Sequence, residues 1–170
     1  DWLVSQSILG DPDQESISVI DEPIFYTLTH YRGVDQLKHL QSQLSLELPG
    51  SPRQVLVSQQ SRIYRLAPES YGFYNPTVGM IEKLKQIPTS VAATVDLSHA
   101  RVRIKLTGAK AQALLRFGIS VDLDNQVFGV NEFIQTSLDH NPVLLDHCGQ
   151  HHYELMFLRT FAETQLQWLV

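Results

Sequence analysis

The chain has 170 residues, 43% of them hydrophobic, which is enough to bury one substantial core but not two fully independent ones. Acidic residues outnumber basic ones by 18 to 13, and the net charge of -5 repels phosphate backbones, which argues against nucleic acid as a partner. The single cysteine, Cys148, rules out an intrachain disulfide and is typical of a reducing compartment. No window approaches the roughly 18 continuous apolar residues of a membrane-spanning helix, and residues 1–9 lack the pattern of a secretory signal. We therefore expect a cytoplasmic protein with no membrane segment.

The N-terminal part of the chain changes from a polar stretch to periodic apolar patterns. Residues 1–16 are polar and poor in periodicity, which indicates an N-terminal arm. Residues 17–31 are rich in β-forming side chains and predict a strand that is apolar on both faces. Five apolar residues then recur three to four positions apart, which predicts one face of a helix: Val34, Leu37, Leu40, Leu44 and Leu48.

Short β-forming stretches and a second helix complete the first half. The Pro49-Gly50 pair ends the first helix. Three short strands are predicted next, at residues 55–57, 63–66 and 71–74. A second helix is predicted over residues 77–86, with Leu84 among its inward-facing residues.

The second half opens with two strands of alternating pattern, at residues 91–97 and 101–106. The second of these is predicted to be half-buried, with a cationic outer face formed by Arg101, Arg103 and Lys105. A short helix is predicted over residues 109–117, and Gly118 follows it where a left-handed C-terminal cap is expected.

The end of the chain predicts three further strands and a last helix. The strands fit residues 131–138, 142–148 and 152–158. Thr160 and Glu163 stand at the spacing of a capping box, so the last helix is expected to begin there.

Short strands and helices that alternate in this way predict an α+β fold made of two small open-faced α/β sandwich lobes, with helices on one side of each sheet. We expect residues 17–170 to form a single domain, with lobes at about 17–88 and 89–170. A wholly parallel, doubly wound sheet fits this order of elements less well.

One stretch near the C-terminus is dense in side chains that bind metals. It contains Asp146, His147, Cys148, His151, His152 and Glu154 around a Gly149-Gln150 turn. A zinc site can be drawn from His147, Cys148 and His151, but neighbours on a strand point to opposite faces and do not easily share one ion. We favour a hairpin of exposed polar residues with a core thiol, and we expect no metal site.

No catalytic set stands out elsewhere. Cys148 has no spacing signature of a nucleophile, and the Leu106-Thr107-Gly108 junction matches neither the Walker nor the dinucleotide-binding pattern. The strip of Arg101, Arg103 and Lys105 fits a solvated face, an anion site or a subunit contact. The aromatics around Tyr64 and at 71–74 fit core packing better than stacking on a pteridine or flavin.

From Thr94 onward the chain holds a series of short, distinctive segments: VDLSHAR (95–101), IKLTGAKA (104–111), VDL (121–123), FGV (128–130), QT (135–136), PVLL (142–145), YEL (153–155) and RTFA (159–162). In their order and spacing these segments resemble the gamma subunit of heterotetrameric sarcosine oxidase. The Leu-Thr-Gly-Ala element at 106–109 is also similar to the wider aminomethyltransferase superfamily, whose folate-binding domain has a fold of this kind.

The resemblance implies an accessory subunit without catalytic or cofactor-binding residues of its own. In the heterotetrameric family the complex oxidises the N-methyl group of sarcosine, passes the one-carbon unit to tetrahydrofolate and yields glycine. The implied partners are alpha, beta and delta subunits, which hold FAD, FMN, NAD, the folate site and zinc. This agrees with the absence of a catalytic set in the pattern of the chain itself.

Two alternatives stay open at this point. The chain is also similar to the matching subunit of an N-methylglutamate dehydrogenase, which uses related subunits on another N-methyl amino acid. A free-standing folate-binding protein is the second alternative, suggested by the Leu106-Thr107-Gly108 junction and the aromatic cluster.

A subunit interface is expected where cationic side chains cluster on this acidic chain and where apolar residues fall outside any periodic pattern. Arg101, Arg103 and Lys105 place three cations on one strand of an acidic protein. Trp2 and Ile8 in the arm are apolar residues with no periodic place in the domain. We expect these five residues to lie at or near a contact with a partner subunit.

Overall fold

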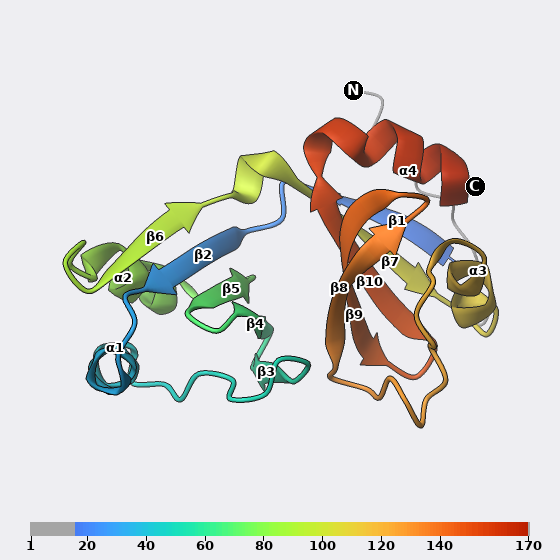
Figure 1. Ribbon diagram of the computed structural model, residues 1–170. Helices are drawn as coiled ribbons and strands as arrows, with labels where there is room; N and C mark the ends of the chain where they lie inside the picture. Colours follow the sequence, from blue (N-terminus) through green and yellow to red (C-terminus); the bar gives the residue numbers. More distant parts are fainter. Residues whose placement is uncertain (1–15, 170) are drawn as a thin grey trace. The chain divides into compact units, whose positions relative to one another are not determined.

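The computed structural model describes residues 16–169, apart from the side chain of Val34, and shows ten strands and four α-helices in this part of the chain (Figure 1). The elements are β1 (Ser16–Asp21), β2 (Phe25–His30), α1 (Val34–Leu44), β3 (Val55–Ser58), β4 (Ser61–Ala67), β5 (Ser70–Tyr74), α2 (Val78–Gln86), β6 (Ala92–Asp96), β7 (Arg101–Thr107), α3 (Ala111–Gly118), β8 (Phe133–Leu138), β9 (Asn141–Gly149), β10 (His152–Leu158) and α4 (Ala162–Leu169). Short 3-10 turns precede β7 (Ser98–Ala100) and α4 (Arg159–Phe161).

The chain divides into two compact units, each built on one five-stranded sheet. One unit is Ile24–Ser98, and the other joins the described residues up to Pro23 to those from His99 onward. The expected lobe boundary at about residue 88 therefore needs correction, because β6 pairs with β2 of the first sheet and β1 pairs with β7 of the second. The α+β class with two open-faced sheets is confirmed.

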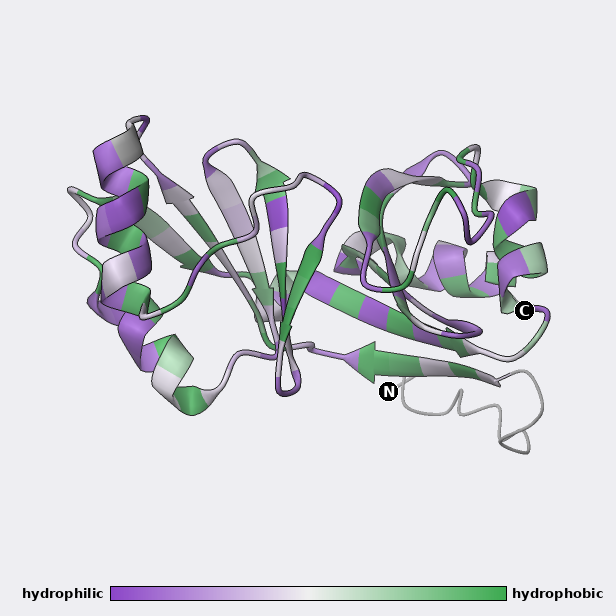
Figure 2. Cartoon of the chain, turned by 90° about the horizontal axis from the view of Figure 1, so that it is seen from below, coloured by the Kyte–Doolittle hydropathy of each residue, from purple (hydrophilic) through white to green (hydrophobic). Residues whose placement is uncertain are grey.

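The Ile24–Ser98 unit has strand order β3-β4-β5-β2-β6, and all its paired strands are antiparallel. Helices α1 and α2 pack on this sheet, since Leu40 and Leu84 belong to the same buried cluster as Leu28 and Phe73. Both helices mix hydrophilic and hydrophobic residues along their length, as the amphipathic pattern predicts (Figure 2).

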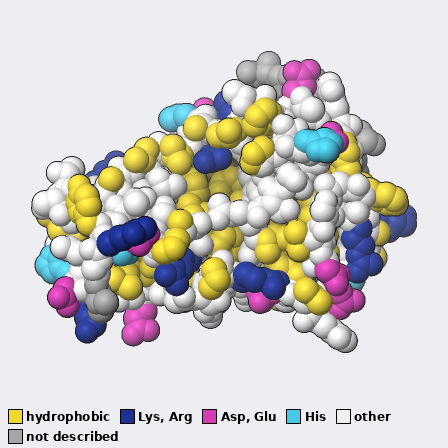
Figure 3. Space-filling view, in the orientation of Figure 1, with side chains coloured by type: hydrophobic (Ala, Val, Ile, Leu, Met, Phe, Trp, Pro, Cys, Tyr) yellow, Lys and Arg dark blue, Asp and Glu magenta, His cyan; other side chains and the backbone are white. Residues whose placement is uncertain are grey.

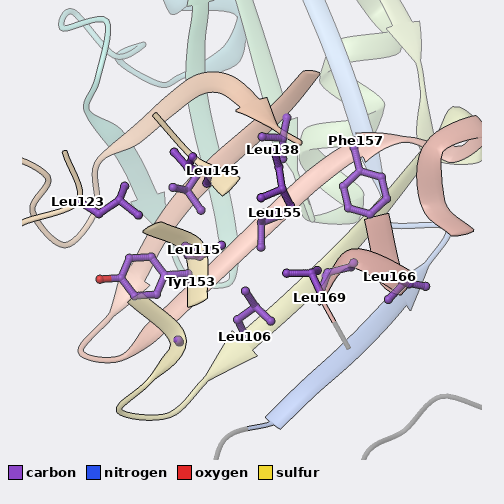
Figure 4. Close-up of a cluster of buried hydrophobic side chains, with 14 of the residues drawn as sticks. Leu106, Leu115, Leu123, Leu138, Leu145, Tyr153, Leu155, Phe157, Leu166 and Leu169 are labelled. Carbon is purple, nitrogen blue, oxygen red and sulfur yellow. The ribbon is translucent and has the colours of Figure 1, made fainter. Parts of the chain in front are cut away.

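The other unit has strand order β1-β7-β10-β9-β8, also antiparallel throughout. One face of this sheet carries the main hydrophobic cluster, to which α3 contributes Leu115 and α4 contributes Leu166 (Figure 4). Along β7 and β10, residues two apart such as Tyr153 and Leu155 enter this cluster. The alternate residues of both strands point to the opposite face, where the candidate site lies.

The predicted strand over residues 17–31 is two strands in two different sheets. Glu22 has a positive φ of 55°, and Pro23 follows it without a backbone N–H. These residues end β1 at Asp21 and let β2 begin at Phe25 in the other unit. A run of β-forming residues predicts extended backbone but does not show which sheet accepts it.

Two predicted helix ends also differ in detail. Helix α1 ends at Leu44, with Ser45 in the left-handed region at φ 54°, so Leu48 is buried beyond the helix rather than on it. Helix α3 ends at Gly118, but the φ of this glycine is not positive, so the prediction of a left-handed cap was wrong. A Cβ built on Gly118 meets the side chains of Trp168 and Leu138, which shows that close packing requires a glycine there.

The remaining predicted elements are confirmed within a few residues. Thr77 is the N-cap of α2 and its hydroxyl accepts a hydrogen bond from the backbone N–H of Met80 at 3.2 Å. Thr160 lies in the 3-10 turn, and α4 begins two residues later at Ala162. Across the described residues, no helix has the length and apolar character needed to cross a bilayer.

Candidate functional site

The candidate site is a buried ionic cluster on the face of the β7-β10-β9 sheet that lies opposite the hydrophobic cluster. Val102, Ile104 and Leu106 of β7 enter the hydrophobic cluster, which turns Arg103 to the other face. Arg103 is 0% exposed, and so is Asp146 of β9, while Glu154 of β10 is 8% exposed. Three ionisable side chains from three adjacent strands therefore share one buried face.

These groups are joined by charge-assisted hydrogen bonds. Arg103 Nη2 donates to Asp146 Oδ2 at 2.9 Å, and Arg103 Nε donates to Glu154 Oε2. The second oxygen of Glu154, Oε1, is 2.9 Å from His152 Nε2. Buried charges are retained only when they are paired and hydrogen-bonded in this way.

This geometry corrects the prediction of a cationic outer face on β7. The alternation placed Arg101, Arg103 and Lys105 on one face correctly, but Arg103 is fully buried and bound to two carboxylates. Its partners are 43 and 51 residues away in sequence, so no local pattern on β7 could show them. Arg101 and Lys105 are half-buried.

The neighbours of Glu154 keep its carboxylate ionised although the group is buried. Burial raises the pKa of this carboxyl, but the hydrogen bond from His152 and the charge and hydrogen bond of Arg103 outweigh it, so the pKa falls from 4.5 to about 2. Glu154 is therefore ionised over the whole physiological range.

The β9-β10 hairpin separates the residues that the sequence grouped as one ligand set. His147 faces the hydrophobic cluster: its ring stacks on Tyr153 with centroids 4.5 Å apart, and its Nδ1 lies 3.0 Å from the carbonyl oxygen of Phe128. His151 is exposed in the turn, with φ at 56°. This placement agrees with the prediction that His147 and Cys148, as neighbours on one strand, point to opposite faces.

A different group of ligand-type side chains comes together instead. The pairing register shifts between His152 and Tyr153, which are opposite Gly149 and His147, so Cys148 is an extra residue in a β-bulge. Ligand atoms of Cys148, His152 and Glu154 all lie within 4.8 Å of one another. The spacing of His152 and Glu154, two apart on one strand, was the signal that could have found this group.

The other predicted features have structural explanations. Tyr64, Tyr71 and Phe73 are all at most 1% exposed, which confirms that these aromatics pack the interior. On the face drawn in Figure 3, cationic and acidic side chains are dispersed among hydrophobic ones rather than gathered by sign. Trp2 and Ile8 of the expected interface, and the arm to which they belong, lie outside the described residues.

An apolar groove is the other cavity of note. It has a volume of about 370 Å³ and lies between the start of β1, the end of β7 and α3, with Leu106, Leu114 and Phe117 in its lining. Phe117 is 88% exposed at its rim. Its polar lining residues are Ser16, Thr107 and Lys110, and the hydroxyls of Ser16 and Thr107 hydrogen-bond to each other at 2.5 Å.

Comparison with solved structures defines the class of fold. Glycine cleavage system aminomethyltransferase T from Bartonella henselae matches with a TM-score of 0.57 and 14% identity, over 90% of this chain and 44% of that chain. Heterotetrameric sarcosine oxidase from Corynebacterium sp. U-96, in complex with pyrrole 2-carboxylate, matches with a TM-score of 0.81 and 23% identity, over 95% of this chain and 84% of that chain. The fold is therefore of the aminomethyltransferase-like class and is shared with a chain of that oxidase.

Sequence comparison gives the particular family. The model of the sarcosine oxidase, gamma subunit family matches residues 37–170, and the chain belongs to this family. Sarcosine oxidase subunit gamma of Corynebacterium sp. (strain U-96) is 37% identical over 76 residues, and that of an Arthrobacter species is 36% identical over the same length. Each alignment covers 45% of this chain and 37% of the relative, so the chain spans little more than a third of the curated relatives' length in these matches.

Proposed function

We propose that this chain is an accessory, non-catalytic subunit of a sarcosine-oxidase-like flavoenzyme complex. The observation that carries the proposal is the family match over residues 37–170. The fold shared with heterotetrameric sarcosine oxidase supports it. The ionic cluster fits a structural role, because Arg103, Asp146 and Glu154 bind one another.

The proposed complex carries out oxidative demethylation of sarcosine to glycine, with transfer of the one-carbon unit to tetrahydrofolate. Its partners would be alpha, beta and delta subunits, and FAD, FMN, NAD, tetrahydrofolate and zinc would be bound by those subunits. This chain would contribute folded surface to the assembly rather than reacting groups, in the cytoplasm.

Co-expression tests this proposal. An affinity-tagged chain, produced together with the alpha, beta and delta genes that we expect beside its own, should retain a yellow partner with flavin absorbance. The same tagged chain produced alone is the control. Recovery of only the colourless free chain from the co-expressing cells would overturn the proposal.

The alternative within this class is a subunit of an N-methylglutamate dehydrogenase. The proposed role of this chain is the same in both complexes, so the chain itself does not distinguish them. Turnover of sarcosine against N-methylglutamate by the purified complex separates the two.

The match to aminomethyltransferase T favours a second candidate, a free-standing folate-binding protein. A folate site needs a deep apolar slot with a few polar anchors, and the chain covers 44% of that aminomethyltransferase. Calorimetric titration of the chain with tetrahydrofolate tests this candidate, and no heat at high micromolar concentration would dismiss it.

We further propose that Arg101, Lys105, Trp2 and Ile8 contribute to the contact with a partner subunit. Nε of Arg101 is buried with no hydrogen-bond partner among the described residues, so a partner's carboxylate could complete its bonding. Arg103 is ion-paired with Asp146 and Glu154 of its own sheet. Of the three cations on β7, we therefore propose only Arg101 and Lys105 for the contact. Replacing Arg101 or Lys105 by Glu should slow assembly in a salt-dependent way, and unchanged assembly rates would contradict the contact.

A further inference from the structure

We propose that Cys148, His152 and Glu154 form a binding site for a single zinc-like divalent cation at the β9-β10 bulge. The observation behind the proposal is geometric: Cys148, two residues after Asp146 on β9, comes together with His152 and Glu154 of β10 beside the bulge. Their ligand atoms lie within 4.8 Å of one another. This site is independent of the proposed subunit function and concerns only the chain's own residues.

The three side chains match the chemistry of zinc. A thiolate, an imidazole and a carboxylate are the three common zinc ligands, and three protein ligands leave a fourth position for water. Metal–ligand bonds of about 2.0–2.3 Å place tetrahedral ligand atoms roughly 3.5 Å apart. His152 Nε2 and Glu154 Oε1 are already 2.9 Å apart, so small side-chain rotations complete the arrangement. An ion bound between these two atoms would replace the hydrogen bond that now joins them.

Side chains around the three ligands fix the orientation of Glu154 by hydrogen bonds. Glu154 Oε2 accepts from Arg103, and Arg103 donates in turn to Asp146, so the carboxylate is fixed with its other oxygen directed at His152. Hydrogen bonds of this kind to ligating carboxylates are a regular feature of metal sites.

The local charge also favours a dication. The single positive charge of Arg103 faces the two carboxylates of Asp146 and Glu154. Ionisation of the Cys148 thiol, which metal binding requires, adds a third negative charge. A divalent ion then brings the cluster to neutrality, whereas a monovalent ion leaves a net negative charge buried.

An ion can reach the site from solvent. The side chain of His152 is 28% exposed and Cys148 is half-buried, whereas Arg103 and Asp146 are fully buried behind them. The cluster is thus open on its cysteine and histidine side and closed on its arginine side.

Titration of the full-length, untagged chain with cobalt(II) chloride alone, followed by zinc(II) chloride, tests the site. We expect one equivalent of cobalt to bind with a thiolate-to-cobalt charge-transfer band, and zinc to displace it. Cys148→Ser should abolish that band, and His152→Ala should weaken binding at least about tenfold. The matched control is His151→Ala, an exposed neighbour in the same turn, which should bind as the unchanged chain does.

The outcomes separate a built site from adventitious binding. A cobalt complex without the charge-transfer band, or an equal loss of affinity in His151→Ala, would overturn the proposal. Circular dichroism of each variant shows whether it is folded, and the two ligand variants should fold because both positions are partly exposed. Failure of this site leaves the proposed subunit role untouched, because co-purification with a flavin-bearing partner is measured separately.

Discussion

Arg103 is the residue whose environment differs most from what its strand pattern indicates. On β7 it alternates with apolar residues as a solvent-facing cation would, yet it is fully buried between Asp146 and Glu154. The alternation determines the face correctly but does not show what covers that face. The carboxylates that neutralise Arg103 come from β9 and β10, which pair with β7 only in the folded sheet.

Removing the guanidinium should be strongly destabilising. Arg103→Met leaves two buried carboxylates without their cation, so we expect the free energy of unfolding to fall by about 3–5 kcal/mol. Lys105→Met, two residues along the same face and half-buried, is the matched control and should change it by about 0.5 kcal/mol or less. Urea denaturation of both variants measures the difference. Equal effects in the two variants would contradict the ion-pair assignment.

Glu154 should make stability depend on acid pH. Its pKa in the folded chain is about 2, below the ordinary 4.5, so its ionised form stabilises the fold fully above about pH 4.5 and loses this effect as the pH falls toward 2. The stability difference between the unchanged chain and Glu154→Gln should therefore be constant near neutrality and shrink below pH 4.5. Denaturation at a series of pH values measures it, with the exposed Glu82→Gln as control. A difference that grows on acidification would contradict the depressed pKa.

At the scale of elements, the positions of helices and strands could be predicted from the sequence where a single hydrophobic periodicity continued without interruption. Helix α2 and strands β3, β4 and β5 were predicted within a few residues, because each has a clear spacing and a proline or glycine near its ends. It was insufficient at residues 17–31, where two consecutive strands of similar composition belong to different sheets. Composition predicts extended backbone, but sheet membership depends on partners distant in sequence.

Gly118 provides a test of packing between elements. At the end of α3 a Cβ on this residue would meet Trp168 of α4 and Cδ1 of Leu138 of β8, the latter at 2.6 Å. Gly118→Ala should therefore destabilise the fold by about 1–3 kcal/mol through overpacking. Gly79→Ala in α2 meets nothing within 4 Å and should be neutral or stabilising by up to about 1 kcal/mol. Thermal denaturation compares them, and a Gly118→Ala variant as stable as Gly79→Ala would refute this packing.

At the scale of the whole molecule, the fold class and family could be predicted from the sequence, but the unit boundary could not. The motifs from Thr94 onward carried the family resemblance, and the family match over residues 37–170 bears it out. The boundary was missed because β1 completes a sheet whose other strands begin after residue 100. The stretch that holds the ligand group was recognised, but the set drawn from it was His147, Cys148 and His151, and the two-residue spacing that places His152 and Glu154 on one face was not used.

The proposed role of this chain is that of one subunit in a flavin-bearing complex. Native mass spectrometry tests this role on the complex purified through a tagged beta subunit that is co-expressed with alpha, delta and this chain. We predict one copy of this chain per flavin-bearing partner, in a particle that keeps its flavin absorbance. A flavin-bearing complex that assembles without this chain, although the chain is abundant and folded in the same cells, would contradict the proposed role.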